Sequence, residues 1–101
     1  MDIFLLLKTL FDKTPTRNHL EILDDINKLL SVNGLHEEKE QLELEISASF
    51  TGSELCLRSA SKLLTLQDKN KQVNKIVGHL TRELVSYCRS NGLYPKVNHE
   101  A

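Results

Sequence analysis

Apolar side chains recur every three or four residues along much of the chain, which is the spacing of one face of an α-helix. The first such face predicts a helix over residues 3–11, and Asp2 suits its start because the helix dipole favours an acid there. Pro15 ends it, since the residue before a proline avoids helical backbone angles. The apolar positions of this first helix are Ile3, Leu6, Leu7, Leu10 and Phe11.

A second apolar face predicts a helix between Thr16 and Asn33. The Thr16 hydroxyl can cap its first turn, and Gly34 can adopt the left-handed backbone angle that often ends a helix. Its apolar positions are Ile22, Leu23, Ile26, Leu29 and Leu30.

Residues 41–58 fit two structures. Strict alternation of apolar and polar residues over 41–51, followed by Thr51-Gly52-Ser53, is typical of a strand and a hairpin turn. A helix fits as well, and we favour it with a break or kink near Gly52, because residues 36–40 are acidic and good helix formers dominate the stretch. The apolar face of that helix would be Leu42, Ile46, Phe50, Leu57, Ala60 and Leu64.

The clearest apolar face lies near the C-terminus and predicts a last helix that Asp68 caps and Asn91-Gly92 ends, with Pro95 preventing its continuation. Its members are Val73, Ile76, Val77, Leu80, Leu84, Tyr87 and Cys88. Four amphipathic helices with mostly short links predict an all-α fold, an antiparallel four-helix bundle. A length of 101 residues fits one domain spanning 1–101, with residues 93–101 as a C-terminal tail.

Charge is unevenly distributed although the net charge is −1. Residues 1–50 hold ten acids and five bases, and residues 51–101 hold four acids and eight bases. The halves therefore carry −5 and +4, which predicts two solvated faces that attract each other or a mildly basic C-terminal surface for an acidic partner.

Cys56 and Cys88 lie far apart and form no CxxC motif, so we predict two buried free thiols in a reducing compartment. The apolar run near the N-terminus is too short for a signal peptide, and no stretch approaches the length of a membrane-spanning helix. We therefore expect a cytoplasmic protein.

No pattern of catalytic residues is visible. The four histidines form no HExxH motif and have no metal-ligand spacing with a cysteine, and no glycine-rich phosphate loop or GxSxG motif occurs. Carboxylates such as Asp24-Asp25 form local runs, whereas hydrolytic acid pairs converge from different elements. We expect a binding protein with no enzymatic activity, metal or cofactor.

Two features could contact a partner. Lys71, Lys75, Arg82 and Arg89 fall along one side of the last predicted helix, as a solvated face or a phosphate-contacting one. Apolar residues Leu93, Tyr94 and Val97 follow the helix end, where they either fold back on the bundle or meet a partner.

Two stretches resemble the immunity proteins of class IIa (pediocin-like) bacteriocins, the enterocin A immunity family. One is the segment 20–30, LEILDDINKLL, and the other is Asn91-Gly92-Leu93-Tyr94 after the last helix, whereas residues 42–60 depart from that family's pattern. The resemblance implies a cytosolic antiparallel four-helix bundle that protects a bacterium from a bacteriocin. It implies action inside the cell, at the complex of the bacteriocin with the membrane components of a mannose (sugar) permease.

In that family the C-terminal half tends to decide which bacteriocin is resisted. We therefore take as partner-binding candidates Arg82, Arg89, Asn91, Gly92, Leu93 and Tyr94. The alternatives are a small helical nucleic-acid-binding regulator or antitoxin, favoured by the basic residues of the last helix, and a generic protein-interaction adaptor. No nucleic acid partner is expected in the first hypothesis, and the oligomeric state stays open.

Overall fold

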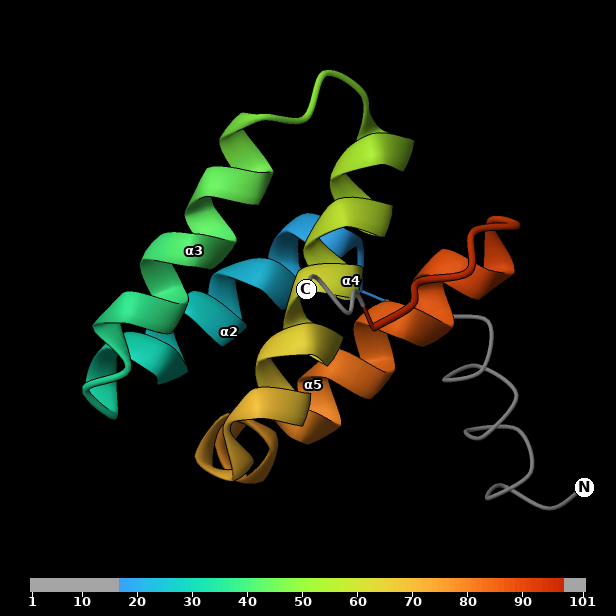
Figure 1. Ribbon diagram of the computed structural model, residues 1–101. Coiled ribbons are helices and arrows are strands. Elements are labelled where there is room, and N and C mark those ends of the chain that lie inside the picture. Colours follow the sequence, from blue (N-terminus) through green and yellow to red (C-terminus); the bar gives the residue numbers. More distant parts are fainter. Residues whose placement is uncertain (1–16, 98–101) are drawn as a thin grey trace, which may run out of the picture.

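The computed structural model describes residues 17–97, which form four α-helices and no β-strand (Figure 1). In chain order the helices are α2 (His19–Val32), α3 (His36–Ser47), α4 (Gly52–Lys69) and α5 (Lys71–Ser90). The prediction of an all-α four-helix bundle is confirmed. Its four helices differ from the predicted set, because the helix predicted over 3–11 lies outside the described residues and the third predicted element forms two helices.

Each described helix packs against two others. α5 lies between α2 and α4, and α3 contacts α4 and, less extensively, α2. Figure 1 shows α3 (green) and α4 (yellow) joined at one end of the molecule, with α5 (orange to red) crossing α4. The arrangement closes around one core whose buried apolar residues are Ile22, Leu23, Ile26, Leu30, Leu35, Leu42, Cys56, Ala60, Leu63, Leu66, Val73, Val77, Leu80, Leu84 and Cys88.

α2 begins later than the sequence suggested. The side chain of Asn18 accepts a hydrogen bond from the backbone N–H of Glu21 at 3.0 Å, which satisfies one of the free donors of the first turn. The prediction that Thr16 caps this helix is therefore wrong, because asparagine caps at least as well and stands nearer the first buried residue. The predicted end is confirmed, since Asn33 is the C-cap and Gly34 has a φ of +74°.

The hairpin alternative for residues 41–58 is excluded. Those residues belong to α3 and α4, which are separated by the link 48–51 just before Gly52. The Thr51 hydroxyl accepts the N–H of Glu54 at 3.1 Å and caps α4. The predicted break near Gly52 is thus a complete interruption between two helices.

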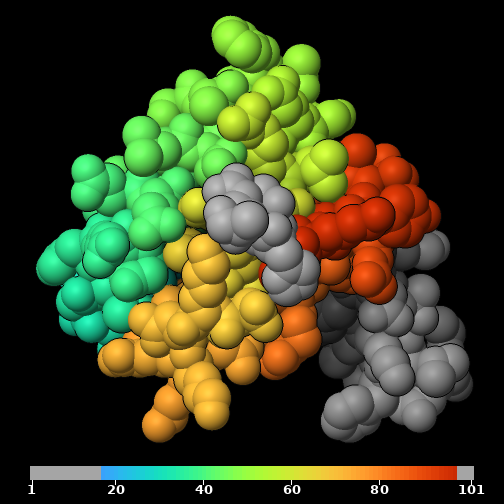
Figure 2. Space-filling model, in the orientation of Figure 1, coloured from blue at the N-terminus to red at the C-terminus, as the bar shows by residue number. Residues whose placement is uncertain are grey.

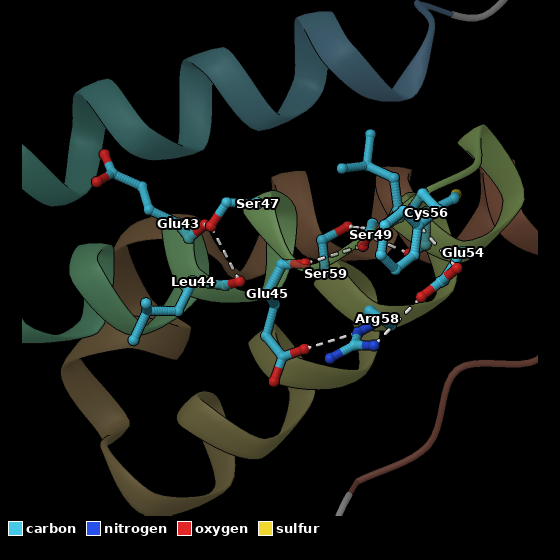
Figure 3. Close-up of polar contacts among 11 residues, drawn as sticks. Glu43, Leu44, Glu45, Ser47, Ser49, Glu54, Cys56, Arg58 and Ser59 are labelled. Carbon is cyan, nitrogen blue, oxygen red and sulfur yellow. Dashed lines mark hydrogen bonds and ion pairs between the residues drawn. The ribbon is translucent and has the colours of Figure 1, made fainter.

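Arg58 holds the two sides of this interruption together (Figure 3). Its Nε donates to Glu45 of α3 at 3.0 Å, and its Nη1 donates to Glu54 of α4 at 3.2 Å. The hydrogen bond to Glu45 is the largest of several causes that raise the pKa of Arg58. The Arg58–Glu45 pair joins an acid of the first half to a base of the second, on a surface where each such bond contributes modestly.

The link changes which residues face the core. Phe50, predicted as a core position, is 93% exposed because α3 ends at Ser47. The buried face of α4 includes Cys56, Ala60, Leu63 and Leu66, while the predicted Leu57 and Leu64 lie at its partly buried flanks. The predicted apolar face was continued in one helical phase across the predicted break near Gly52. The interruption shifts that phase by about one residue, so Ala60 alone of the α4 positions was placed correctly.

α5 carries the apolar face that the sequence predicted. Val73, Val77, Leu80, Leu84 and Cys88 are buried, with Ile76 and Tyr87 packed at the margin. The helix is capped by Asn70, whose side chain accepts the N–H of Gln72 at 3.0 Å. The prediction that Asp68 caps this helix is wrong, because α4 continues through that residue to Lys69.

Arg17 ties the start of α2 to α5. Its guanidinium donates to both carboxylate oxygens of Glu83, at 3.2 and 2.9 Å, and also to Asp25. These hydrogen bonds, first that with Glu83, raise the pKa of Arg17 above its usual range. A guanidinium that serves two carboxylates fixes the orientation of α2 on α5.

No helix within residues 17–97 combines the length and apolar character needed to cross a membrane.

The core position of Leu63 yields a first prediction. Leu63 is fully buried, so Leu63→Ala should lower the free energy of unfolding by about 2–5 kcal/mol through lost burial and a cavity. Val32→Ala is the matched control, because Val32 is 83% exposed and its truncation should change that energy by less than about 0.5 kcal/mol. Urea unfolding followed by circular dichroism measures both, and equal effects would contradict the described core.

Candidate functional site

The segment 91–97, here called the tail segment, leaves α5 and returns along the surface of the bundle. Gly92 has a φ of +79°, which reverses the chain and is a conformation that side-chain-bearing residues rarely adopt. The N–H groups of Asn91 and Leu93 both donate to the carbonyl of Cys88, at 3.0 and 2.9 Å. The predicted stop at Asn91-Gly92 is therefore confirmed as a C-terminal cap of the helix.

The tail segment is attached to α4 as well. The N–H of Lys96 donates to the Ser61 hydroxyl at 3.2 Å, and Pro95 is buried. Leu93 packs at the edge of the core, whereas the neighbouring Tyr94 is 64% exposed. Figure 2 shows this red segment lying on the surface of the molecule. The prediction that the tail folds back on the bundle is confirmed for Leu93, and contact of the tail with a partner stays a prediction.

A small cavity lies beneath the start of the tail segment. It has a volume of about 220 Å³, and we call it the tail cavity; it is lined by His19, Gly52, Ser53, Cys56, Tyr87, Asn91 and Leu93. The rings of His19 and Tyr87 meet in it with centroids 5.3 Å apart. Nδ1 of His19 is buried and has no hydrogen-bond partner among residues 17–97. The cavity thus has a mixed lining, in which apolar Leu93 lies beside polar Ser53 and Asn91.

A second hollow, here called the arginine groove, separates α4 from α5. It has a volume of about 360 Å³ and is lined by Leu64, Gln67, Thr81, Arg82, Val85, Ser86 and Arg89. Neither arginine forms an ion pair within the described part of the chain. Two cations on an apolar floor suit a partner that offers carboxylates beside apolar side chains.

The six partner-binding candidates therefore do not form one site. Arg82 and Arg89 line the arginine groove, Asn91 and Leu93 line the tail cavity, and Gly92 makes the turn between helix and tail. Tyr94 lines neither of them and is 64% exposed. Arg89 and Asn91 are two residues apart in sequence, which corresponds to about 200° of rotation around a helix axis, so they open onto different surfaces.

The cysteines are the main feature that sequence reasoning missed. Cys56 of α4 and Cys88 of α5 form a disulfide with a Cα–Cα distance of 6.1 Å, so the prediction of two free thiols is wrong. Their predicted burial is confirmed, at 2% and 0% exposed. A pair of cysteines on the core faces of adjacent antiparallel helices could have indicated the disulfide. This pair was missed because the helical phase of α4 was assigned wrongly.

Among residues 17–97, no group of three or more His, Cys, Asp or Glu side chains converges on a possible metal site. A comparison with protein-family models, with curated proteins and with solved structures finds no match for this chain.

The turn at Gly92 yields a second prediction. Gly92→Ala should destabilise the protein by about 1–2 kcal/mol, because a side chain at positive φ is strained. Gly52→Ala is a sharp control, since a Cβ at either glycine would meet nothing within 4 Å and Gly52 lies in a helix. That control should be neutral or stabilise by up to about 1 kcal/mol. Chemical denaturation measures both, and a neutral Gly92→Ala would argue against the turn.

Proposed function

We propose that this protein is a bacteriocin immunity protein that protects its producer cell from a pediocin-like bacteriocin. It would act inside the cell without enzymatic activity, by binding the complex between the bacteriocin and a membrane sugar permease. The observation that carries the proposal is an exposed Tyr94 held in a fixed tail segment, at the position where the resemblance to the enterocin A immunity family puts recognition.

Tyr94 has the properties of an interface anchor. A tyrosine offers a large apolar ring and a polar hydroxyl, and such residues often dominate binding energy. The residues on either side of Tyr94 are already held in the free protein. Pro95 is buried, and the N–H groups of Asn91 and Leu93 are hydrogen-bonded to the carbonyl of Cys88. Binding through a pre-ordered segment loses less conformational entropy than binding through a free tail.

The arginine groove extends the surface on which such a partner could lie. Arg82 and Arg89 are seven residues apart on α5, which corresponds to about 10 Å along a helix. Leu64 and Val85 lie on the groove floor and are partly buried. A protein helix with acidic residues two turns apart around an apolar side chain would complement this groove.

The disulfide bears on the proposed location. Disulfides are rare in a reducing cytosol, where free thiols prevail. Cys56 and Cys88 are 2% and 0% exposed, so a protein reductant has little direct access to the bond. A cytoplasmic location therefore requires that the cross-link persist through burial or that the protein function in its reduced form as well.

A nucleic-acid-binding regulator is the second candidate. Its support is the exposure of Lys71, Lys75, Arg82 and Arg89 along α5. Binding to phosphates would weaken steeply as salt rises, because counterions are released. A gel-shift assay with duplex DNA and RNA separates the candidates, since salt-sensitive binding at physiological ionic strength supports the regulator and no binding even at low salt removes it.

Removal of the Tyr94 ring should weaken resistance to the bacteriocin. Expression of the wild-type chain in a sensitive strain should confer resistance to at least one member of a panel of pediocin-like peptides. Tyr94→Ala should lower the protected peptide concentration by about tenfold or more, as expected when an anchor worth ~1.4 kcal/mol is lost. Minimal inhibitory concentrations measure this, and circular dichroism should find the variant folded.

Phe50→Ala is the control for this experiment, because Phe50 is also an exposed aromatic residue but lies in the link between α3 and α4. It should leave resistance unchanged. If cells that express the wild-type chain well remain sensitive to every peptide in the panel, the proposed function is refuted. Full resistance with Tyr94→Ala would refute the role of the tail segment.

A further inference from the structure

We propose that Cys56 is a site of thiol–disulfide exchange with small thiols, which reach it through the tail cavity, and that exchange releases the anchor of the tail segment. This inference concerns the chemistry of the disulfide and does not rest on the proposed immunity function.

The two sulfur atoms are not equivalent. Cys56 lines the tail cavity together with His19, Ser53 and Leu93, whereas Cys88 does not line it and is fully buried. A cavity of about 220 Å³ has room for a molecule of a few heavy atoms. The geometry therefore favours attack by a low-molecular-weight thiol at Cys56 rather than at Cys88.

The exchange balances without any other reagent. A small thiolate forms a bond to the Cys56 sulfur, the bond between Cys56 and Cys88 breaks, and Cys88 leaves as a thiolate that takes up a proton. A second small thiolate then attacks the sulfur of the bound small molecule, and Cys56 leaves as a thiolate. Two small thiols are oxidised to one small disulfide, and the protein disulfide is reduced by the same two electrons.

His19 offers an imidazole ring for the first step. It lines the same cavity, and its Nδ1 is buried with no hydrogen-bond partner among the described residues. A small thiol is a weak nucleophile until it loses its proton, because the thiolate is the attacking species. A neutral imidazole nitrogen is a suitable acceptor for that proton.

The cross-link lies directly under the tail segment. The carbonyl of Cys88 accepts hydrogen bonds from the N–H groups of Asn91 and Leu93, and Leu93 also forms part of the cavity wall. Breaking the bond to Cys56 would remove the covalent link between α4 and the last turn of α5, whose Cys88 accepts these two hydrogen bonds. The redox state of this cysteine pair would thus control how firmly the tail segment is held.

Single-cysteine variants test whether a small reagent reaches the sulfur of Cys56 more readily than that of Cys88. Cys88→Ser leaves Cys56 as a thiol beside the cavity, and Cys56→Ser leaves Cys88 enclosed. With hydroxyethyl disulfide as the probe, the Cys88→Ser protein should form its mixed disulfide at least about tenfold faster, as mass spectrometry measures, because exchange rates follow access to the sulfur. Equal rates, or faster reaction of the Cys56→Ser protein, would overturn the proposal.

A second experiment keeps both cysteines, in case a single-cysteine variant fails to fold. Ser53→Trp should fill the cavity and slow reduction of the full-length disulfide by 2-mercaptoethanol by about tenfold, because a blocked sulfur reacts slowly. Ser47→Trp is the matched control on an exposed position of α3 and should reduce at the wild-type rate. Identical rates for both tryptophan variants, or no reduction short of global unfolding in urea, would overturn access through the cavity.

Discussion

The apolar face of α5 is the constraint on which the rest of the structure depends. It runs from Val73 to Cys88, and it is too wide to be covered by one neighbouring helix, so α2 and α4 pack on its two sides. Burial of a side chain such as Leu84 contributes roughly 1.5–3 kcal/mol, and the aligned residues together fix how α5 lies in the bundle. Because the tail segment continues from the end of α5, its position on the surface follows from this packing.

The sequence predicted those elements whose apolar spacing and end signals agree. α2 and α5 have clear faces, and the pairs Asn33-Gly34 and Asn91-Gly92 stop them as expected, since glycine tolerates the positive φ of both turns. Helix starts were less predictable. Asn18 and Asn70 cap where Thr16 and Asp68 were expected, because several polar residues near each start could serve equally well.

Residues 41–66 could not be assigned in detail for a different reason. The link of four residues between α3 and α4 contains neither proline nor glycine, so the helical pattern continues in the sequence although the helix does not. The interruption leaves Phe50 exposed and places Leu57 and Leu64 outside the core. Because the predicted helical phase did not allow for it, the pairing of Cys56 with Cys88 was not predicted. Long-range pairing of this kind depends on helix phase and packing, which one sequence does not contain explicitly.

The sequence likewise identified individual residues of the candidate site but not how they are arranged in space. Charge and position identified Arg82, Arg89 and Tyr94, yet the groove, the cavity and the exposed tail segment arise only when α4 and α5 are placed side by side. The disulfide then connects these features, because Cys88 anchors the tail segment and Cys56 borders the cavity.

We propose that the tail segment is a fixed recognition surface for a bacteriocin–permease complex. Its most direct test is photo-crosslinking in living cells from a photoreactive phenylalanine analogue at position 94, compared with the same analogue at position 50. The account predicts a crosslink to a membrane component of the permease from position 94 alone, and only after a pediocin-like peptide is added. The absence of that crosslink in cells that the protein protects, or an equal crosslink from position 50, would contradict it.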